Sequence, residues 1–269
     1  MKILRDIVGL KKALNGNINL GFVPTMGGLH NGHISLIKKS QQKCKKTLVS
    51  IYVNPKQFNK SKDFLLYPRN LNKDLTILKK LKINYVFLPK KKEIFKDKHK
   101  KIILPKNQNR LCAKIRKGHF EGVLDIMERF IKIIKPKYIF MGDKDFQQLF
   151  LINKFIIKRY NSKIYRCKTI RSKNFVALSS RNFLLNKEAI KSAGFIAKNL
   201  YKFKYKLKYI KRINKYILNK KKELMKLFDI KIEYLEARNE SDLKIYKNKG
   251  KFKLFISYYI DKVRLIDNF

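Results

Sequence analysis

Two histidines three residues apart are the residues of this chain best suited to do chemistry. His30 and His33 follow a short apolar run that ends at Pro24 and a turn opened by Gly27 and Gly28, and an apolar helical pattern begins after them. Glycines let the backbone approach a ligand closely, and the first N–H groups of a helix favour anions. The pattern therefore predicts a strand, a loop and a helix N-terminus that bind a phosphate. The alternative is a glycine turn with two surface histidines.

Composition sets the class of protein. The 269 residues are 45% hydrophobic and 12% aromatic, which predicts one large or two modest domains with real cores. Lys and Arg exceed Asp and Glu by 66 to 19, a net charge of +47 that raises nucleic acid or an anionic membrane as a partner. The lysines are spread along the whole chain, and Asn, Ile, Phe and Tyr, which AT-rich codons encode, are also abundant. We therefore attribute the charge to genome composition and expect no specific nucleic-acid or membrane partner.

The cellular compartment follows from the cysteines and the hydropathy pattern. Cys44, Cys112 and Cys167 are odd in number and far apart, which fits a reducing compartment and no disulfide framework. Residues 1–12 lack the apolar core of a signal peptide, and lysines interrupt every apolar run before it reaches the roughly 18 residues of a membrane span. We expect a soluble cytoplasmic protein.

The order of apolar segments predicts two domains of different character. A short helix is expected over residues 1–16. Apolar strands are expected at 47–53, 84–88, 138–141 and 164–167, alternating with helices at 34–43, 71–81, 124–134 and 149–159. This alternation indicates βαβ units and a parallel sheet. A long helical stretch at 187–228 and strands at 232–236 and 252–260 follow. The predicted fold class is α/β, with a Rossmann-like parallel-sheet nucleotide-binding domain (1–170) followed by a smaller α+β C-terminal domain (171–269).

Polar residues gather where two predicted strands end, the place where open α/β sheets bind ligands. Residues 54–58 (NPKQF) follow one strand and residues 142–148 (GDKDFQQ) another. Lys144 can place a positive charge on phosphates. Asp145 can hold Mg²⁺ directly or through water, or it can cap the following helix. Gln57 and Gln148 are neutral amides able to hydrogen-bond a hydroxy acid.

The connector between the two predicted domains carries a further polar cluster. Ser179, Ser180 and Arg181 combine hydroxyls with a guanidinium, which suits phosphate oxygens. The alternative is a polar hinge with a helix cap, because serine is common in both. Residues 30 and 33 have no Cys or carboxylate at ligand spacing, so we expect no tetrahedral zinc site.

Seven segments in order, from about residue 20 to 268, together resemble the pantoate–β-alanine ligase (pantothenate synthetase) family of the HxGH nucleotidyltransferase superfamily. They are PTMGGLHNGH, VSIYVNPKQF, YPR, GHFEGV, GDKDFQQL, ALSSRN and VRLIDN. The resemblance implies a two-step ligase. ATP and pantoate first form pantoyl adenylate and pyrophosphate, and the amine of β-alanine then displaces AMP to give pantothenate. Mg²⁺ would arrive with ATP, and a homodimer is expected.

The resemblance also implies roles for residues at the matching positions. Those expected at ATP are Met26, Gly27, Gly28, Leu29, His30, Asn31, Gly32, His33, Gly142, Asp143, Lys144, Asp145, Ile170, Leu178, Ser179, Ser180 and Arg181. Among them His33 is the implied proton donor, with His30 and Lys144 as the other catalytic residues, and backbone amides of residues 26–33 are expected on the phosphates. Pantoate and β-alanine are assigned to Gln57, Gln148, Asn54 and Arg116. Asp145 is the candidate Mg²⁺ ligand, and His119 is expected to be structural.

Three departures from the family pattern stand near these motifs. Asp143 occupies a position where Glu is usual, and Lys117 one where Pro is common. Asn174-Phe175 replaces a typical Asp-Gly, and Phe175 lacks the access of glycine to positive φ, although Asn174 can adopt that conformation. An altered hinge is therefore expected here.

Two other functions compete with the ligase. Another adenylyltransferase, or a synthetase-like fragment that uses tRNA, could share the histidine motif, and the charge of +47 would suit RNA. It leaves NPKQF and GDKDFQQ unexplained. A non-enzymatic binding protein with a relic fold is the third hypothesis, and the intact histidines, Lys144 and the SSR cluster argue against it.

Overall fold

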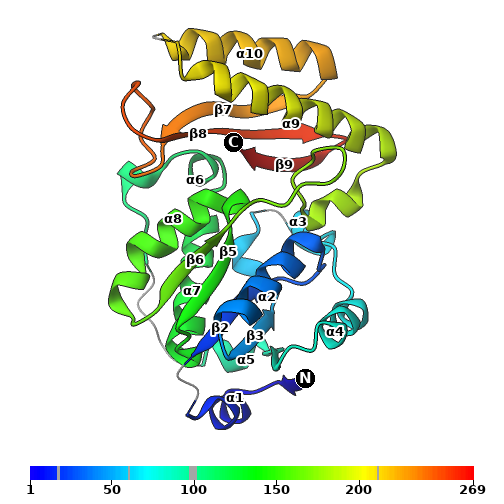
Figure 1. Ribbon diagram of the computed structural model, residues 1–269, viewed down its shortest axis with the longest axis vertical. Helices are drawn as coiled ribbons and strands as arrows, with labels where there is room; N and C mark the ends of the chain where they lie inside the picture. The colour runs from blue at the N-terminus through cyan, green and yellow to red at the C-terminus, as the bar shows by residue number, and fades with distance from the viewer. Residues whose placement is uncertain (17–18, 60, 97–101, 211) are drawn as a thin grey trace. The chain divides into compact units, whose positions relative to one another are not determined.

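The computed structural model describes residues 1–16, 19–59, 61–96, 102–210 and 212–269, which form two compact units (Figure 1). The first unit comprises Met1–Asn109 and Ala113–Lys168, and the second comprises Arg110–Cys112 and Thr169–Phe269. The division after Lys168 lies close to the boundary that the sequence predicts. Ile18, the first residue of the apolar run that ends at Pro24 and is predicted to form a strand, lies outside the described residues.

A six-stranded parallel sheet forms the first unit, in the order β1-β4-β3-β2-β5-β6. Its strands are β1 (Lys2–Leu4), β2 (Leu20–Thr25), β3 (Lys46–Ile51), β4 (Tyr85–Phe87), β5 (Tyr138–Gly142) and β6 (Lys163–Cys167). Its helices are α1 (Ile7–Leu14), α2 (Asn31–Lys43), α3 (Ser61–Leu65), α4 (Leu71–Lys80), α5 (Lys91–Ile94), α6 (Cys112–Ile115, whose first residue belongs to the second unit), α7 (His119–Ile134) and α8 (Phe146–Phe155). Short 3₁₀ turns are η1 (Pro55–Gln57), η2 (Lys106–Gln108), η3 (Asp143–Asp145) and η4 (Ile157–Arg159). The predicted parallel α/β fold is confirmed.

Helices cover both faces of this sheet, which explains why its central strands β2 and β3 are mostly buried. Successive strand residues point to opposite faces. Val23 shares a core with Ile37 of α2, whereas the ring of the preceding Phe22 lies 5.8 Å from that of Phe130 in α7. All four residues are almost completely buried. The sheet is thus held between α2 and α7.

The direction of chain progression changes at β2. From β2 the chain moves through β3 to β4 on one side, whereas β5 and β6 lie on the other side of β2. In open α/β sheets such a switch point leaves a crevice at the carboxyl ends of the strands, and ligands bind there. The loops after β2, β3 and β5 all leave the sheet at this edge.

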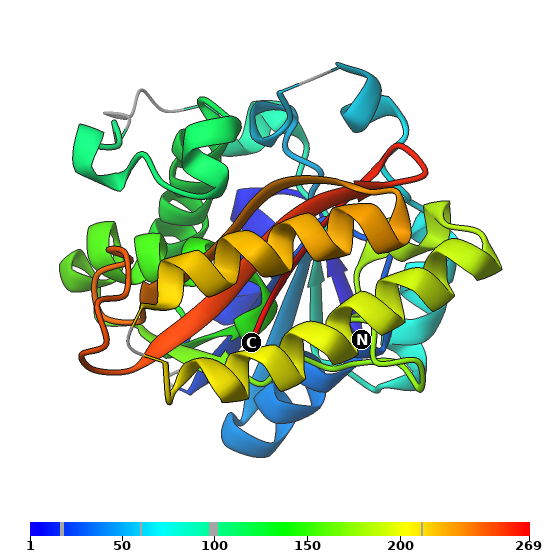
Figure 2. The same cartoon turned by 90° about the horizontal axis from the view of Figure 1, so that it is seen from above.

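The second unit is a smaller α+β body. Its strands β7 (Lys231–Asn239), β8 (Phe252–Ile260) and β9 (Val263–Asn268) form an antiparallel sheet. Helices α9 (Lys187–Leu207) and α10 (Ile213–Phe228) lie beside each other over this sheet (Figure 2), and η5 (Ser180–Leu184) precedes them. Leu200, Leu224 and Leu254 are fully buried in its core.

Several predicted elements differ from the structure at their ends. Residues 2–4 form the edge strand β1, parallel to β4, and the helix predicted over 1–16 begins only at Ile7, after the cap from Asp6. Strand β2 continues through Pro24. On its β5 side only Gly21 and Phe22 are paired, so the hydrogen-bond ladder to β5 has ended before Pro24. An unpaired side tolerates a residue without an N–H. The helical stretch predicted at 187–228 is present as two helices, α9 and α10.

Helix α7 is longer than predicted. It begins at His119, after Gly118 at φ 78°, so the GHFEGV segment supplies the first turn of this helix instead of preceding it. The other predicted strands and helices are present with small shifts of their ends.

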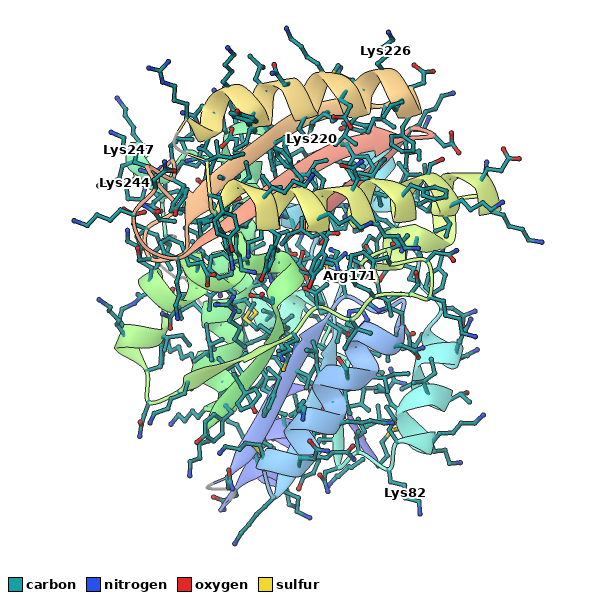
Figure 3. All side chains as sticks on the ribbon, turned by 45° about the horizontal axis from the view of Figure 1, so that its top comes forward. Lys82, Arg171, Lys220, Lys226, Lys244 and Lys247 are labelled. Atoms are coloured by element: carbon teal, nitrogen blue, oxygen red, sulfur yellow. The ribbon has the colours of Figure 1, made fainter. Side chains whose placement is uncertain are left out.

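Lysines are distributed over both units. In Figure 3 the labelled Lys82, Lys226, Lys244 and Lys247 extend away from the ribbon, the first in one unit and the other three in the other. Among the described residues, no helix combines the length and the apolar character needed to span a membrane.

Candidate active site

The loop after β2 is shaped by two glycines and one buried carboxylate. Gly27 and Gly28 have φ values of 80° and 62°, a region open to glycine at no steric cost. Asp74, in the first turn of α4 and only 2% exposed, accepts hydrogen bonds from Gly28 N at 2.9 Å and Leu29 N at 2.8 Å. A Cβ on Gly27 would lie 2.9 Å from Asp74 Oδ2. In this conformation the amides of Gly28 and Leu29 therefore bind the Asp74 carboxylate, whereas the family resemblance implies that they bind the phosphates.

The two histidines cap helix α2 reciprocally. His30 is the N-cap residue, and its Nδ1 accepts a hydrogen bond from Gly32 N at 3.1 Å. His33 Nδ1 in turn accepts from His30 N at 3.4 Å, and the ring centroids lie 4.1 Å apart. This is a capping box built from imidazoles. Because each Nδ1 is an acceptor, each neutral ring carries its proton on Nε2 and can donate it to a ligand.

The surroundings of the two rings keep both of them neutral. Burial, followed by the positive charge of Lys144, lowers the pKa of His30 to about 4, against a smaller raising effect of Asp145. Burial, followed by His30 and then Lys144, lowers the pKa of His33 to about 3. At physiological pH the site thus presents two uncharged donors beside one lysine cation.

The turn after β5 supplies that lysine. Lys144 lies in η3, with Nζ 3.4 Å from Asp145 Oδ1. A Cβ on Gly142 would meet no heavy atom of the described residues within 4 Å, so the backbone of β5 borders open space at its carboxyl end. Asp143 is turned to Arg166 of β6, with Oδ1 2.5 Å from Nε and Oδ2 3.1 Å from Nη2. The carboxylate that stands where Glu is usual is thus engaged in an ion pair.

Asp145 does not cap the following helix. It occupies the N-cap position of α8, but its side chain makes no capping hydrogen bond, so the capping alternative is wrong for this structure. Its side chain is 49% exposed, which leaves carboxylate oxygens accessible at the edge of the sheet. Oxygen ligands of this kind suit Mg²⁺, directly or through water.

The loop after β3 carries Gln57 on a rigid turn. Gln57 is mostly buried in η1, and its carbonyl oxygen accepts from Arg116 Nη2 at 3.0 Å and contacts His119 Nδ1 at 2.6 Å. Asn54, 1% exposed, donates to Gly122 O at 3.0 Å and accepts from Lys56 N at 3.3 Å. Asn54 and Arg116 are predicted at the acid substrate. In the structure, the hydrogen bonds of Asn54 to Gly122 and of Arg116 to the Gln57 carbonyl hold the loop that presents Gln57.

The sheet brings three predicted segments to one edge. Residues 26–33 follow β2, Gln57 follows β3 and residues 142–148 follow β5, and β2 lies between β3 and β5. Gln57 in η1 and Gln148 in α8 therefore follow the two strands that flank β2, the strand before the histidine loop. Met26, Asn31 and Gly32 belong to this loop and to the first turn of α2.

The connector residues belong to the second unit, and they are ordered locally. Leu178 N donates to Ile170 O at 2.9 Å, so the segment folds back on itself. Ser179 caps η5 by accepting from Arg181 N at 3.3 Å, which confirms the predicted helix cap. Ser180 is buried.

Phe175 adopts a backbone conformation that favours glycine. Its φ is 73°, and Asn174, the residue expected to relieve the strain, is not at positive φ. The ring packs 5.3 Å from Tyr201 and 4.9 Å from the guanidinium of Arg171. The carbonyl of Phe175 accepts from Arg171 Nη1 at 3.2 Å. Side-chain packing thus holds a turn that is ordinarily left to glycine.

Lys117 is the third departure. Its side chain is exposed, and its carbonyl accepts from Asn59 Nδ2 at 2.6 Å. Within the ranges that the structure describes, no group of three or more His, Cys, Asp or Glu residues is placed to hold a metal ion.

Comparisons with known proteins match this arrangement over the full chain. The sequence profile of the family described as Pantoate-beta-alanine ligase matches residues 2–269. This chain belongs to the pantoate–β-alanine ligase family.

Individual relatives and solved structures similar to this chain carry the same family name. The pantothenate synthetase of Endomicrobium trichonymphae is 38% identical over 278 residues, covering 100% of this chain and 97% of the relative. That of Fervidobacterium nodosum is 36% identical over 261 residues, covering 96% and 93%. Among solved structures, the Francisella tularensis pantoate–β-alanine ligase complexed with beta-gamma ATP and beta-alanine superposes with a TM-score of 0.84 at 36% identity, covering 100% of this chain and 97% of that one. Pantothenate synthetase from Thermus thermophilus gives 0.90 at 25%, covering 100% and 99%.

The structure of this ligase reveals two residues that sequence reasoning missed. Asp74 holds the histidine loop. The sequence feature that could have revealed this role is its position between Leu71 and Leu75, on the otherwise apolar stripe of α4. Asp125 of α7 binds Lys56 of the Gln57 loop at 3.2 Å. It stands within a run of buried residues of that helix, where an unpaired acid would be costly.

Proposed function

We propose that this chain condenses pantoate with β-alanine at the expense of ATP, through a pantoyl-adenylate intermediate. A carboxylate oxygen of pantoate attacks the α-phosphorus of ATP, and the bond to pyrophosphate breaks. The amine of β-alanine then attacks the acyl carbon, AMP leaves with the carboxylate oxygen, and the amine loses a proton. The family match over residues 2–269 supports the reaction class.

The observation that carries the mechanism is the pair of neutral imidazoles at the N-terminus of α2. Both Nδ1 atoms accept backbone N–H groups, so both Nε2–H groups are left to donate to phosphate oxygens. The transition state of adenylation develops charge on these oxygens, and fixed donors stabilise it without reorganisation. Lys144 adds a positive charge from the neighbouring strand.

His33 can act as a proton donor only after it has taken up a proton, and its ring is neutral in the substrate-free protein. A pKa near 3 keeps the ring neutral before substrate binds. The anionic triphosphate favours the protonated form of a nearby imidazole, because an opposite charge stabilises the charged state. We propose that His33 first donates a hydrogen bond from Nε2, and that it takes up and releases a proton only with the phosphates in place.

The two glutamines are proposed for the acid substrate. Pantoate carries two hydroxyls and a carboxylate, and an amide can donate to and accept from such groups without adding charge. Gln57 and Gln148 lie in the elements that follow β3 and β5, the neighbours of β2, which suits a substrate whose carboxylate must reach the α-phosphate. Ser179, Ser180 and Arg181 are proposed to contact phosphate oxygens, with Ile170 and Leu178 beside the nucleotide.

Mg²⁺ is proposed to arrive with ATP, with Asp145 as its protein ligand. Asp74 is satisfied by backbone amides and Asp143 by Arg166, whereas the side chain of Asp145 is half-exposed. When bound, the ion neutralises phosphate charge. We also propose a homodimer and a cytoplasmic location, the latter because Cys44, Cys112 and Cys167 are free thiols.

ATP–pyrophosphate exchange tests the proposal against its competitors. The exchange is measured with pantoate, with a panel of amino acids with and without tRNA, and with no added acid. Pantoate-dependent exchange, followed by AMP release when β-alanine is added, is the expected result. Exchange that depends on an amino acid, or no exchange with any acid, would overturn the assignment.

A further inference from the structure

The turn that carries Gln57 is bound to helix α7 at three positions. Gly122 O accepts from Asn54, His119 Nδ1 contacts the Gln57 carbonyl, and Asp125 binds Lys56. Positions 119, 122 and 125 are spaced three apart, so they line one face of the first two turns of the helix.

The approach of loop and helix is close enough to require a glycine. A Cβ on Gly122 would lie 2.3 Å from the carbonyl oxygen of Lys56. Within the turn, Gln57 N donates to Asn54 O at 3.0 Å, and Phe58 N donates to Pro55 O at 3.1 Å. The backbone N–H and carbonyl of Gln57 are thus both used to fix the turn, and its side-chain amide is the part left for a substrate.

Asp125 is the buried end of the third tie. It is 2% exposed, and its two oxygens are divided between Lys56 Nζ at 3.2 Å and Arg129 Nε at 2.7 Å. Phe95 lies against both cations, with its ring centre 4.3 Å from Lys56 Nζ and 4.8 Å from the Arg129 guanidinium. Burial raises the pKa of Asp125, but the hydrogen bonds from Arg129 and Lys56 outweigh it and hold this pKa below its usual value.

The helix itself does not need Lys56. Arg129 lies one turn after Asp125 and would still pair with it if the lysine were lost. Lys56, by contrast, is the residue next to Gln57, and its half-exposed side chain turns inward to a buried carboxylate of another element. A tie of this kind restrains the loop more than it stabilises the helix.

We propose that Lys56 and Asp125 are positioning residues for Gln57, and that they set the affinity of this site for its hydroxy-acid substrate. The inference rests on the proposed function, in which Gln57 binds pantoate. An error of about 1 Å in a positioning group can cost as much as 10²-fold in rate, so a loosened turn is expected to matter although neither residue contacts substrate.

Lys56→Met tests the proposal, because it keeps the long apolar stem against Phe95 and removes only the charge. The KM for pantoate in ATP–pyrophosphate exchange should rise about tenfold, the size expected for lost positioning, while the KM for ATP changes less than about twofold. Lys56→Arg should restore the wild-type value. Lys220→Met is the matched control, because Lys220 forms a 2.6 Å ion pair with Glu223 within α10, in the other unit. It should change neither constant.

Hydrogen–deuterium exchange of the substrate-free protein gives a readout that does not depend on activity. The amides of Gln57 and Phe58 should exchange about tenfold faster in Lys56→Met and Asp125→Asn than in wild type, with no such change in Lys220→Met, because these two N–H groups close the restrained turn. The positioning role would be overturned if hydrogen–deuterium exchange at both amides were unchanged in Lys56→Met and Asp125→Asn. An unchanged KM for pantoate in Lys56→Met would also overturn it. If the wild type shows no pantoate-dependent exchange of pyrophosphate, the proposed function fails, and amide exchange alone then decides whether Lys56 and Asp125 hold the turn.

Discussion

The loop after β2 and the connector turn at 172–175 both need backbone at positive φ, and they obtain it by opposite means. The first uses Gly27 and Gly28 and ties their neighbourhood to the buried Asp74. The second places Phe175 at φ 73° and holds it by the packing of its ring. The first shape is encoded in residue types that the sequence shows, and the second in contacts that only the fold shows. Substitutions in each loop should separate the two means.

Loss of the Asp74 carboxylate should have the largest effect. Asp74→Ala leaves the amides of Gly28 and Leu29 without their acceptor, and each unsatisfied buried donor costs about 1–3 kcal/mol, so the free energy of unfolding should fall by about 2–6 kcal/mol. Pyrophosphate exchange should slow by roughly 10² or more because the histidine loop shifts. Denaturant unfolding and exchange rates check both values. Asp74→Asn, which keeps one acceptor, should be less severe, and equal stability of wild type and Asp74→Ala would show that glycines alone shape the loop.

Removal of one imidazole should separate chemistry from loop shape. His33→Ala should slow pyrophosphate exchange by roughly 10²-fold, the size expected for losing a charge-stabilising donor. The KM for pantoate should stay near the wild-type value, because the acid is assigned to Gln57 and Gln148. Lys220→Met, in α10 of the other unit, provides a control outside the loop. A near wild-type rate for His33→Ala would refute the proposed role of this ring.

The cost of positive φ at residue 175 can be measured by a pair of variants. Phe175→Ala loses the ring contacts and keeps the strained backbone, whereas Phe175→Gly loses the ring and relieves the strain. The glycine variant should therefore be more stable than the alanine variant by about 1 kcal/mol, the typical penalty for a left-handed residue. Thermal unfolding of both checks the order. A glycine variant less stable than the alanine variant would mean that the turn is not strained.

Acid stability should report the depressed histidine pKa values. His30 and His33 titrate near 4 and 3 in the folded protein but near 6.5 when unfolded. Between these values the unfolded chain binds more protons, so stability falls as pH drops below about 6.5, and this loss continues until the folded pKa values are reached. The pH profile of unfolding for His33→Gln, compared with wild type, should be shallower in this window. Parallel profiles would place the folded pKa of His33 near its ordinary value.

The surface ion pair beside Lys144 should have the smallest effect. Arg166→Gln removes the partner of Asp143, but the arginine side chain is 42% exposed, and exposed pairs contribute about 0–1 kcal/mol. Stability and pyrophosphate exchange should both stay close to wild type. A large loss of exchange would show that Asp143 must be held away from the phosphates.

The fold could be predicted where hydrophobic pattern and length agree. Strand β3 and helix α4 follow from continuous apolar or helical spacing, and the parallel sheet follows from their alternation. The three residues of β1 could not be predicted, because so short a strand is selected by its partner β4 and not by its own pattern. The site motifs were visible, since His30, Lys144 and Gln57 stand at the ends of strands. The residues that hold these motifs in place could not be predicted. Asp74 acts through a contact 45 positions away in the chain, and Asp125 through a contact 69 positions away.

Transfer of an isotope from pantoate to AMP tests the central claim most directly. Pantoate labelled with oxygen-18 in its carboxylate is incubated with ATP, Mg²⁺, β-alanine and this protein, and the AMP is examined by mass spectrometry. If a pantoate oxygen attacks the α-phosphorus at the histidine loop, each AMP carries one labelled oxygen. AMP formed without label, or label found in pyrophosphate, would contradict the acyl-adenylate mechanism.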